Sequence, residues 1–186
     1  MRRLAVACLT ALALAACGGA EEPEPPPPTL APTTLPALDS TARLLDANAL
    51  ALDAFEPAKL LALLVDVGFV SGREREFSGK SKTWDRVVAR TLRFSSEEGA
   101  QAYVDWLRSH ADDVLGEAAP APWSTPGETG VAFVLVPCAS CKKEQPTWLA
   151  GWRRETVVAT LLAAGPGANE QRFGALARGL DARLTS

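Results

Sequence analysis

Two cysteines spaced as Cys-x-x-Cys, Cys138 and Cys141, are the residues whose type and spacing most directly suggest chemistry. Such a pair can form a disulfide, exchange electrons with another thiol pair, or supply half of a zinc site. A redox pair needs a cysteine at the start of a helix, but Pro146 would stop a helix almost at once. A zinc site would need two more ligands, and the sequence has no second Cys-x-x-Cys. We expect a structural disulfide that closes a hairpin loop, with thiol–disulfide exchange and metal binding as the alternatives.

His110 is the single histidine and lies between Ser109 and Asp112 in a predicted helix. A nucleophilic relay requires the three side chains to be hydrogen-bonded in series. Residues this close on one helix point in different directions and cannot form that relay. We therefore expect a surface or half-buried histidine, and we predict no catalytic residue here.

The chain begins with the signature of membrane targeting. Two arginines and a short apolar run occupy residues 2–14, followed by small residues and a cysteine. The run is well short of the ~20 residues that span a bilayer, so it is typical of a signal peptide. The stretch Leu14-Ala15-Ala16-Cys17 resembles the lipobox of bacterial lipoproteins.

The resemblance implies that residues 1–16 are removed and that Cys17 becomes the acylated first residue of the mature protein. Two or three acyl chains anchor a protein stably, where one chain holds it only marginally. The expected location is the extracytoplasmic side of the cell membrane. In a host with two membranes it is the outer membrane, which Gly18 would favour by the family's sorting habit.

The net charge of the mature chain limits the classes of partner that we expect it to bind. The full sequence has 19 basic and 22 acidic residues, and loss of Arg2 and Arg3 leaves 17 against 22, a net charge of −5. Nucleic-acid binding calls for clustered Lys and Arg, so nucleic acid is not an expected partner.

The expected location outside the cytoplasm favours persistence of a disulfide between Cys138 and Cys141, the two cysteines that remain after cleavage and lipidation.

A proline-rich segment separates the lipid site from the rest of the chain. Residues 17–38 contain seven of the 14 prolines, whose missing amide donors exclude a helix or a central strand. Polyproline II of ~3.1 Å per residue would hold a domain up to roughly 60 Å from the membrane. We interpret the segment as a spacer, with a proline-rich ligand for a partner as the alternative, and we place a single globular domain at 39–186.

Four helices are predicted in that domain. A Ser40 or Thr41 cap precedes a short helix that reaches Leu52, and Pro57 lies in the first turn of a second helix that Gly68 ends. Ser95 in a capping box opens a helix that ends near Gly116, and Asn169 caps a closing helix that runs to Leu184.

Strand patterns occupy the intervening segments. We predict strands over 69–77, 84–94, 130–137, 147–153 and 155–163, and charge on both faces of the first of these favours an edge position. Arg73, Arg75, Arg86, Arg90 and Arg93 could form a basic sheet face for an anion. Acidic residues between them favour cross-strand ion pairing instead.

These elements indicate an α+β domain with a single antiparallel sheet of about five strands and helices mainly on one face. The similarity of Val87–Leu92 to Val157–Leu162 suggests a duplicated strand-strand-helix unit, with coincidence as the alternative. The order of elements resembles that of small domains in uncharacterised actinobacterial lipoproteins.

Three tryptophans are candidate contacts for a ligand or partner. Trp123 lies in a proline-rich loop, and Trp148 and Trp152 lie on one side of a strand with Ala150 between them. Each could line a binding groove, but packing in the core is the preferred interpretation.

The sequence thus predicts a lipid-anchored protein whose domain binds an unidentified small ligand or envelope protein, with no cofactor, no metal and no enzymatic reaction. The first alternative is an envelope thiol–disulfide oxidoreductase that uses Cys138 and Cys141. The second is a structural or assembly factor of the cell envelope.

Overall fold

The computed structural model describes residues 25–116, 118–135 and 145–185. Its elements are η1 (Pro32–Thr34), β1 (Asp39–Leu45), α1 (Ala47–Leu52), α2 (Pro57–Asp66), β2 (Phe69–Ser78), β3 (Arg86–Phe94), α3 (Glu97–Ser109), α4 (Ala111–Leu115), β4 (Ala119–Pro120), β5 (Thr129–Leu135), β6 (Thr147–Arg154), β7 (Val157–Ala164) and α5 (Glu170–Leu184). No helix in these ranges is both long and apolar enough to cross a bilayer.

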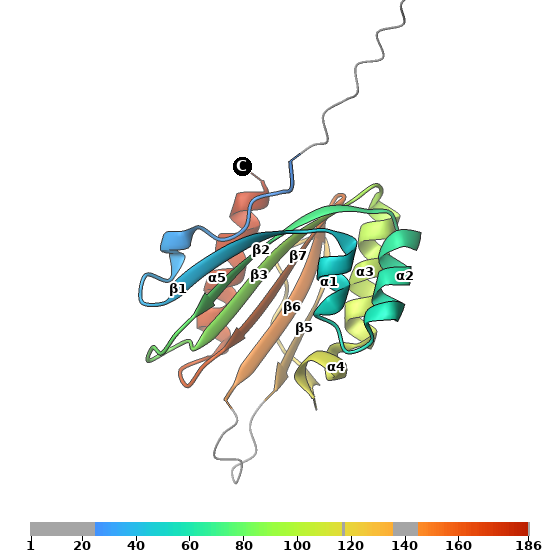
Figure 1. The fold of residues 1–186 in the computed structure, drawn as a ribbon. Helices are drawn as coiled ribbons and strands as arrows, with labels where there is room; N and C mark the ends of the chain where they lie inside the picture. Colours follow the sequence, from blue (N-terminus) through green and yellow to red (C-terminus); the bar gives the residue numbers. More distant parts are fainter. Residues whose placement is uncertain (1–24, 117, 136–144, 186) are drawn as a thin grey trace, which may run out of the picture.

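The strands form one antiparallel sheet in the order β1-β2-β3-β7-β6-β5-β4 (Figure 1). The expected α+β class and single antiparallel sheet are confirmed, but the sheet has seven strands rather than about five. One additional strand is the two-residue β4, which is too short to leave a periodic pattern in the sequence.

The other additional strand, β1, replaces part of a predicted helix. Ser40 and Thr41 do not cap a helix, because residues 39–45 pair in register with β2. The helix begins only after Asp46, whose side chain accepts a hydrogen bond of 2.7 Å from the Ala49 amide. Long-range pairing therefore overrides the local capping signal.

The position of β1 also corrects the prediction for β2. We expected residues 69–77 to form an edge strand, yet β2 lies between β1 and β3. The edge is β1, whose side chains are mostly exposed. The alternating charges of β2 are accommodated in the interior of the sheet by ion pairs on one face, described below.

Helices α1 to α4 pack on one face of the sheet, in line with the expectation of helices mainly on one face, and α5 covers the other face. On one face, called here the α5 face, α5 packs on Trp148, Ala150 and Trp152 of β6. On the opposite face, the α3 face, α1 to α4 pack on side chains such as Leu149 and Val158. Gly151 of β6 lets α3 approach closely, since a Cβ there would lie 2.4 Å from Leu107 Cδ2.

The two-sided arrangement argues against a duplicated unit. β3 and β7 are antiparallel neighbours at the centre, with β2 and β6 on either side. If the chain were a duplication, its two copies would meet at the antiparallel strands β3 and β7 and be related by a twofold axis perpendicular to the sheet. Rotation about such an axis does not exchange the two faces of the sheet, so the helices that follow β3 and β7 would lie on the same face. The helices after β3 and β7 are α3 and α5, and they lie on opposite faces.

Several helix ends match their sequence signals. Pro57 begins α2, and Gly68 after it has φ of 69°, a left-handed conformation that glycine adopts at little cost. Asn169 caps α5 by accepting from the Arg172 amide at 3.0 Å. The cap of α3 is Ser96 rather than Ser95, and the expected single helix to Gly116 is divided at His110 into α3 and α4.

Part of the predicted spacer packs against the domain. We call residues 27–38 the N-terminal strap. The Thr91 hydroxyl donates to the Pro27 carbonyl at 2.8 Å, and Arg183 Nε of α5 donates to the Thr29 carbonyl at 2.6 Å. Leu30 is only 2% exposed in the core of the α5 face. The packed part of the chain therefore begins before Asp39.

Candidate functional site

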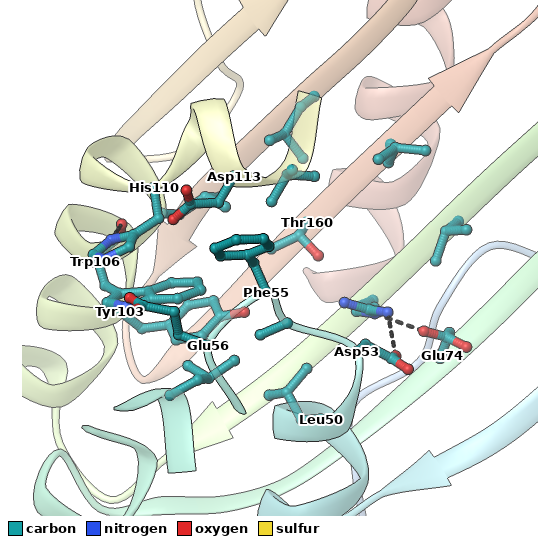
Figure 2. Close-up of a pocket in the computed structure, with 18 of the residues that line it drawn as sticks. Leu50, Asp53, Phe55, Glu56, Glu74, Tyr103, Trp106, His110, Asp113 and Thr160 are labelled. Carbon is teal, nitrogen blue, oxygen red and sulfur yellow. Dashed lines mark hydrogen bonds and ion pairs between the residues drawn. The ribbon is translucent and has the colours of Figure 1, made fainter. Parts of the chain in front are cut away.

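A pocket of about 440 Å³ opens on the α3 face of the sheet. Its floor comes from the central strands, including Val88, Leu149, Thr160 and Leu162. One wall is the loop between α1 and α2, residues 53–56, and the opposite wall is formed by α3 and α4 (Figure 2). We call it the α3-face pocket, and its volume falls in the range that holds small ligands.

One end of the pocket is a cluster of four charges. Glu74 of β2 accepts from Arg43 Nε of β1 at 2.7 Å and from Arg90 Nε of β3 at 2.6 Å. Asp53 Oδ2, at the end of α1, accepts from Nη2 of both arginines at 2.6 Å. Three adjacent strands and one helix end therefore converge on this cluster.

Glu74 is the buried member of the cluster, with a side chain 5% exposed. Burial alone would raise its pKa, but the hydrogen bond from Arg43 and the charge of Arg90 outweigh burial and lower the pKa below the usual carboxyl value. The same carboxylate raises the pKa of Arg43 by hydrogen bonding. The Glu74–Arg43 pair is therefore ionised at neutral pH.

The other end of the pocket is aromatic. Tyr103, Trp106 and His110 follow one another at helical spacing along α3, with ring centroids 5.8 Å and 4.6 Å apart. The His110 ring is half-buried, as expected, and its Nδ1 lies 2.8 Å from the Trp106 carbonyl. Burial raises the pKa of Tyr103.

Two exposed apolar side chains flank the mouth of the pocket. Phe55, in the loop between α1 and α2, is 79% exposed and projects over the pocket in Figure 2. Val114 of α4 is 44% exposed. Both side chains line the cavity, so a ligand that enters would cover apolar surface that is now in water.

The four basic side chains among the described residues that line the pocket all form ion pairs. Besides the two arginines of the cluster, Arg86 pairs with Glu76 at 2.7 Å and Lys59 pairs with Glu56 at 2.6 Å. The described residues contain no group of three or more metal-ligating side chains. The arrangement offers an apolar floor with ordered charges at one end, which is the composition of a binding site.

The structure places Trp148 and Trp152 in the core of the α5 face, with the partly buried Trp123 packed against it, on the opposite side of the sheet from the pocket. Trp152 is fully buried and donates from Nε1 to Asp181 Oδ1 at 3.0 Å. Trp148, 8% exposed, stacks on Phe173 at 5.6 Å, and Trp123 meets the edge of the same ring at 5.4 Å. Packing, the preferred interpretation, describes them better than ligand contact.

The cysteines on which the sequence predictions depend, Cys17, Cys138 and Cys141, lie outside the described residues. The disulfide and its redox alternative, like the lipid site, thus remain predictions.

The arginines of β2 and β3 divide between the two faces. Arg86 and Arg90 form the expected cross-strand ion pairs with Glu76 and Glu74 on the α3 face. Arg75 donates instead to the Ser40 hydroxyl at 2.9 Å. Sequence alternation could have paired Glu74 with Arg90, but it could not add Arg43, because β1 was predicted as helix.

The fold and pocket define an α+β domain with a single antiparallel sheet, helices on both faces and a ligand-sized cavity on the α3 face. No protein-family model matches the sequence, and no curated protein matches it. The fold is similar to that of the extracellular domain of PknH from Mycobacterium tuberculosis, with a TM-score of 0.50 over 78% of each chain and 10% identity. At this identity the likeness concerns the fold alone.

Proposed function

We propose that the chain is a lipid-anchored extracytoplasmic protein whose domain binds a small amphipathic ligand in the α3-face pocket. The observation that carries the proposal is the pocket itself, about 440 Å³ in volume, with an aromatic end and a charged end. A preformed cavity of this kind is the usual form of a small-molecule site.

The location outside the cytoplasm is supported by two separate observations. The lipobox-like stretch that ends at Cys17 implies acylation and export. The similar fold in PknH serves as an extracellular domain in that protein.

A fluorescent probe can test the pocket directly. We expect 1-anilinonaphthalene-8-sulfonate, an amphipathic dye, to bind the folded protein at one site with a blue-shifted emission. Val88→Phe would extend a ring into the cavity from β3 and abolish that binding, since Val88 lies on the pocket floor.

Val65→Phe is the matched control, because Val65 of α2 is 72% exposed and does not line the pocket. The proposal fails if the dye does not bind the folded wild type, or if Val88→Phe binds the dye as well as Val65→Phe does while both proteins keep the wild-type circular dichroism spectrum.

A further inference from the structure

Glu74 forms a hydrogen bond with each of the two arginines of the charged cluster. Its two carboxylate oxygens each accept from a different arginine, Oε1 from Arg43 and Oε2 from Arg90. Both bonds use the Nε atoms, so the outer edges of the guanidinium groups remain directed at the pocket. Because Glu74 is buried on an interior strand, this pair of arginines is preorganised by the sheet.

Asp53 occupies the acceptor position between those outer edges. A single oxygen, Asp53 Oδ2, lies 2.6 Å from Nη2 of each arginine. Unlike Glu74, Asp53 belongs to the end of α1, and its side chain is 31% exposed. The acceptor position is therefore filled by a partly solvated group from a loop, while its donors are fixed by the sheet.

We infer that the pocket ligand is an amphipathic carboxylate whose carboxylate takes the place of Asp53 between Arg43 and Arg90. This inference rests on the proposed binding function and specifies the class of ligand. The incoming carboxylate makes the same charge-assisted hydrogen bonds that Asp53 makes now.

Charge balance favours replacement by an anion over addition of a cation. With Asp53 displaced, two arginines face one buried carboxylate, and a ligand carboxylate restores the balance of the cluster. An amine would find both oxygens of Glu74 already bonded to the arginines. The cluster therefore selects carboxylates against amines of the same length.

The apolar part of the ligand extends from the arginines toward the aromatic end. Leu149 and Leu162 form the floor on this path, and Trp106 lies beyond them in the wall. Phe55 is two residues from Asp53 in the same loop, so displacement of Asp53 frees the segment that carries Phe55. The phenyl ring can then close over the apolar chain and lose its exposed surface.

Isothermal titration of octanoate, octanol and octylamine into the mature chain with Cys17→Ser tests this inference. We expect octanoate to bind at least about tenfold more tightly than octylamine, and more tightly than octanol. Arg43→Gln should weaken octanoate binding about tenfold and leave octanol binding unchanged. Arg43 is 46% exposed, so its loss is better tolerated by the fold than loss of Arg90.

Asp53→Asn provides the decisive variant. Since the amide competes less well for the two arginines, octanoate should bind roughly tenfold more tightly than to the wild type. Arg108→Gln is the control of matched charge, because Arg108 of α3 pairs with Asp105 and does not line the pocket. It should leave all three affinities unchanged.

The outcomes separate the two proposals. If octanol binds as tightly as octanoate, or if Asp53→Asn does not tighten octanoate binding, the pocket binds small molecules but the carboxylate inference is overturned. If none of the three compounds binds and the dye does not bind either, the proposed binding function falls together with the inference.

Discussion

Glu74 is the residue on which the candidate site depends most. It holds Arg43 and Arg90 from adjacent strands, and it is the one member of the cluster that is almost fully buried. A buried charge is tolerated only when it is paired and hydrogen-bonded. The sequence places Glu74 in a run of alternating charges, and only the three-strand register shows that both of its neighbours are arginines.

Glu74→Gln should lower the free energy of unfolding at pH 7 by about 3 kcal/mol, because it removes the buried carboxylate that pairs with both arginines and leaves only the partly exposed Asp53 to balance them. The pKa of Glu74 is lowered in the folded state, so its stabilisation is fully present above the unfolded value of about 4.3 and is lost as the pH falls through the folded value. The difference between wild type and variant should therefore shrink below that range. Urea denaturation at a series of pH values measures both effects.

Glu76→Gln is the matched control, because Glu76 lies on the same strand and face and forms an ion pair with the more exposed Arg86. Its cost should be about 1 kcal/mol or less, as for other partly exposed pairs. Equal costs for the two variants at pH 7 would contradict the central role of Glu74.

At the scale of elements, the N-terminal strap shows where local sequence signals mislead. Four of the seven prolines of residues 17–38 lie in the strap and indicate an extended chain, and the strap is indeed neither helix nor ladder strand apart from the short η1. An extended chain can still pack, however, and Leu30 and Leu38 are buried against the sheet and α5. The pattern predicted the conformation but not the burial, which depends on the surface that the sheet and α5 create.

Leu30→Ala tests the packing of the strap. A buried leucine replaced by alanine should lower the free energy of unfolding by about 2–5 kcal/mol, since a cavity remains in the core. The measurement is thermal or urea denaturation of the mature chain.

Leu52→Ala serves as the comparison, because Leu52 in α1 is 76% exposed and should change stability by about 0.5 kcal/mol or less. If the strap were an unpacked spacer, Leu30→Ala would change the free energy of unfolding as little as Leu52→Ala does.

At the scale of the whole molecule, the lipid site and the pocket belong to different parts of the chain. Lipidation is predicted at Cys17, ten residues before Pro27, where the strap begins. The strap contacts the α5 face, while the pocket opens on the α3 face. The strap that follows the predicted lipid site therefore packs on the side of the sheet opposite the proposed ligand pocket.

Cys17→Ala should release the protein from the membrane fraction, because the acyl chains would have no attachment site. Fractionation of cells after labelling with radioactive palmitate would show label in the wild type and none in the variant. Dye binding in the pocket should be the same in both proteins. Retention of the variant in the membrane fraction, or unchanged labelling, would contradict lipid anchoring at this residue.

The sequence by itself determined the features that depend on near neighbours. These include the α+β class, the helix beginning at Pro57 and ending at Gly68, the Asn169 cap, the strand with Trp148 and Trp152 on one side, and the lipobox-like stretch before Cys17. Each rests on spacing along the chain or on the conformation of one residue, so it is visible without knowledge of the fold.

Only the tertiary structure decided which segments became partners. β1 is a strand because β2 lies beside it, and β2 is interior because β1 covers its edge. Trp148 and Trp152 are core residues because α5 packs over them, and the charged cluster exists because residues from β1, β2, β3 and the end of α1 meet on the other face. These contacts join positions far apart in the chain, and a local pattern carries no information about which distant residue will pair with it.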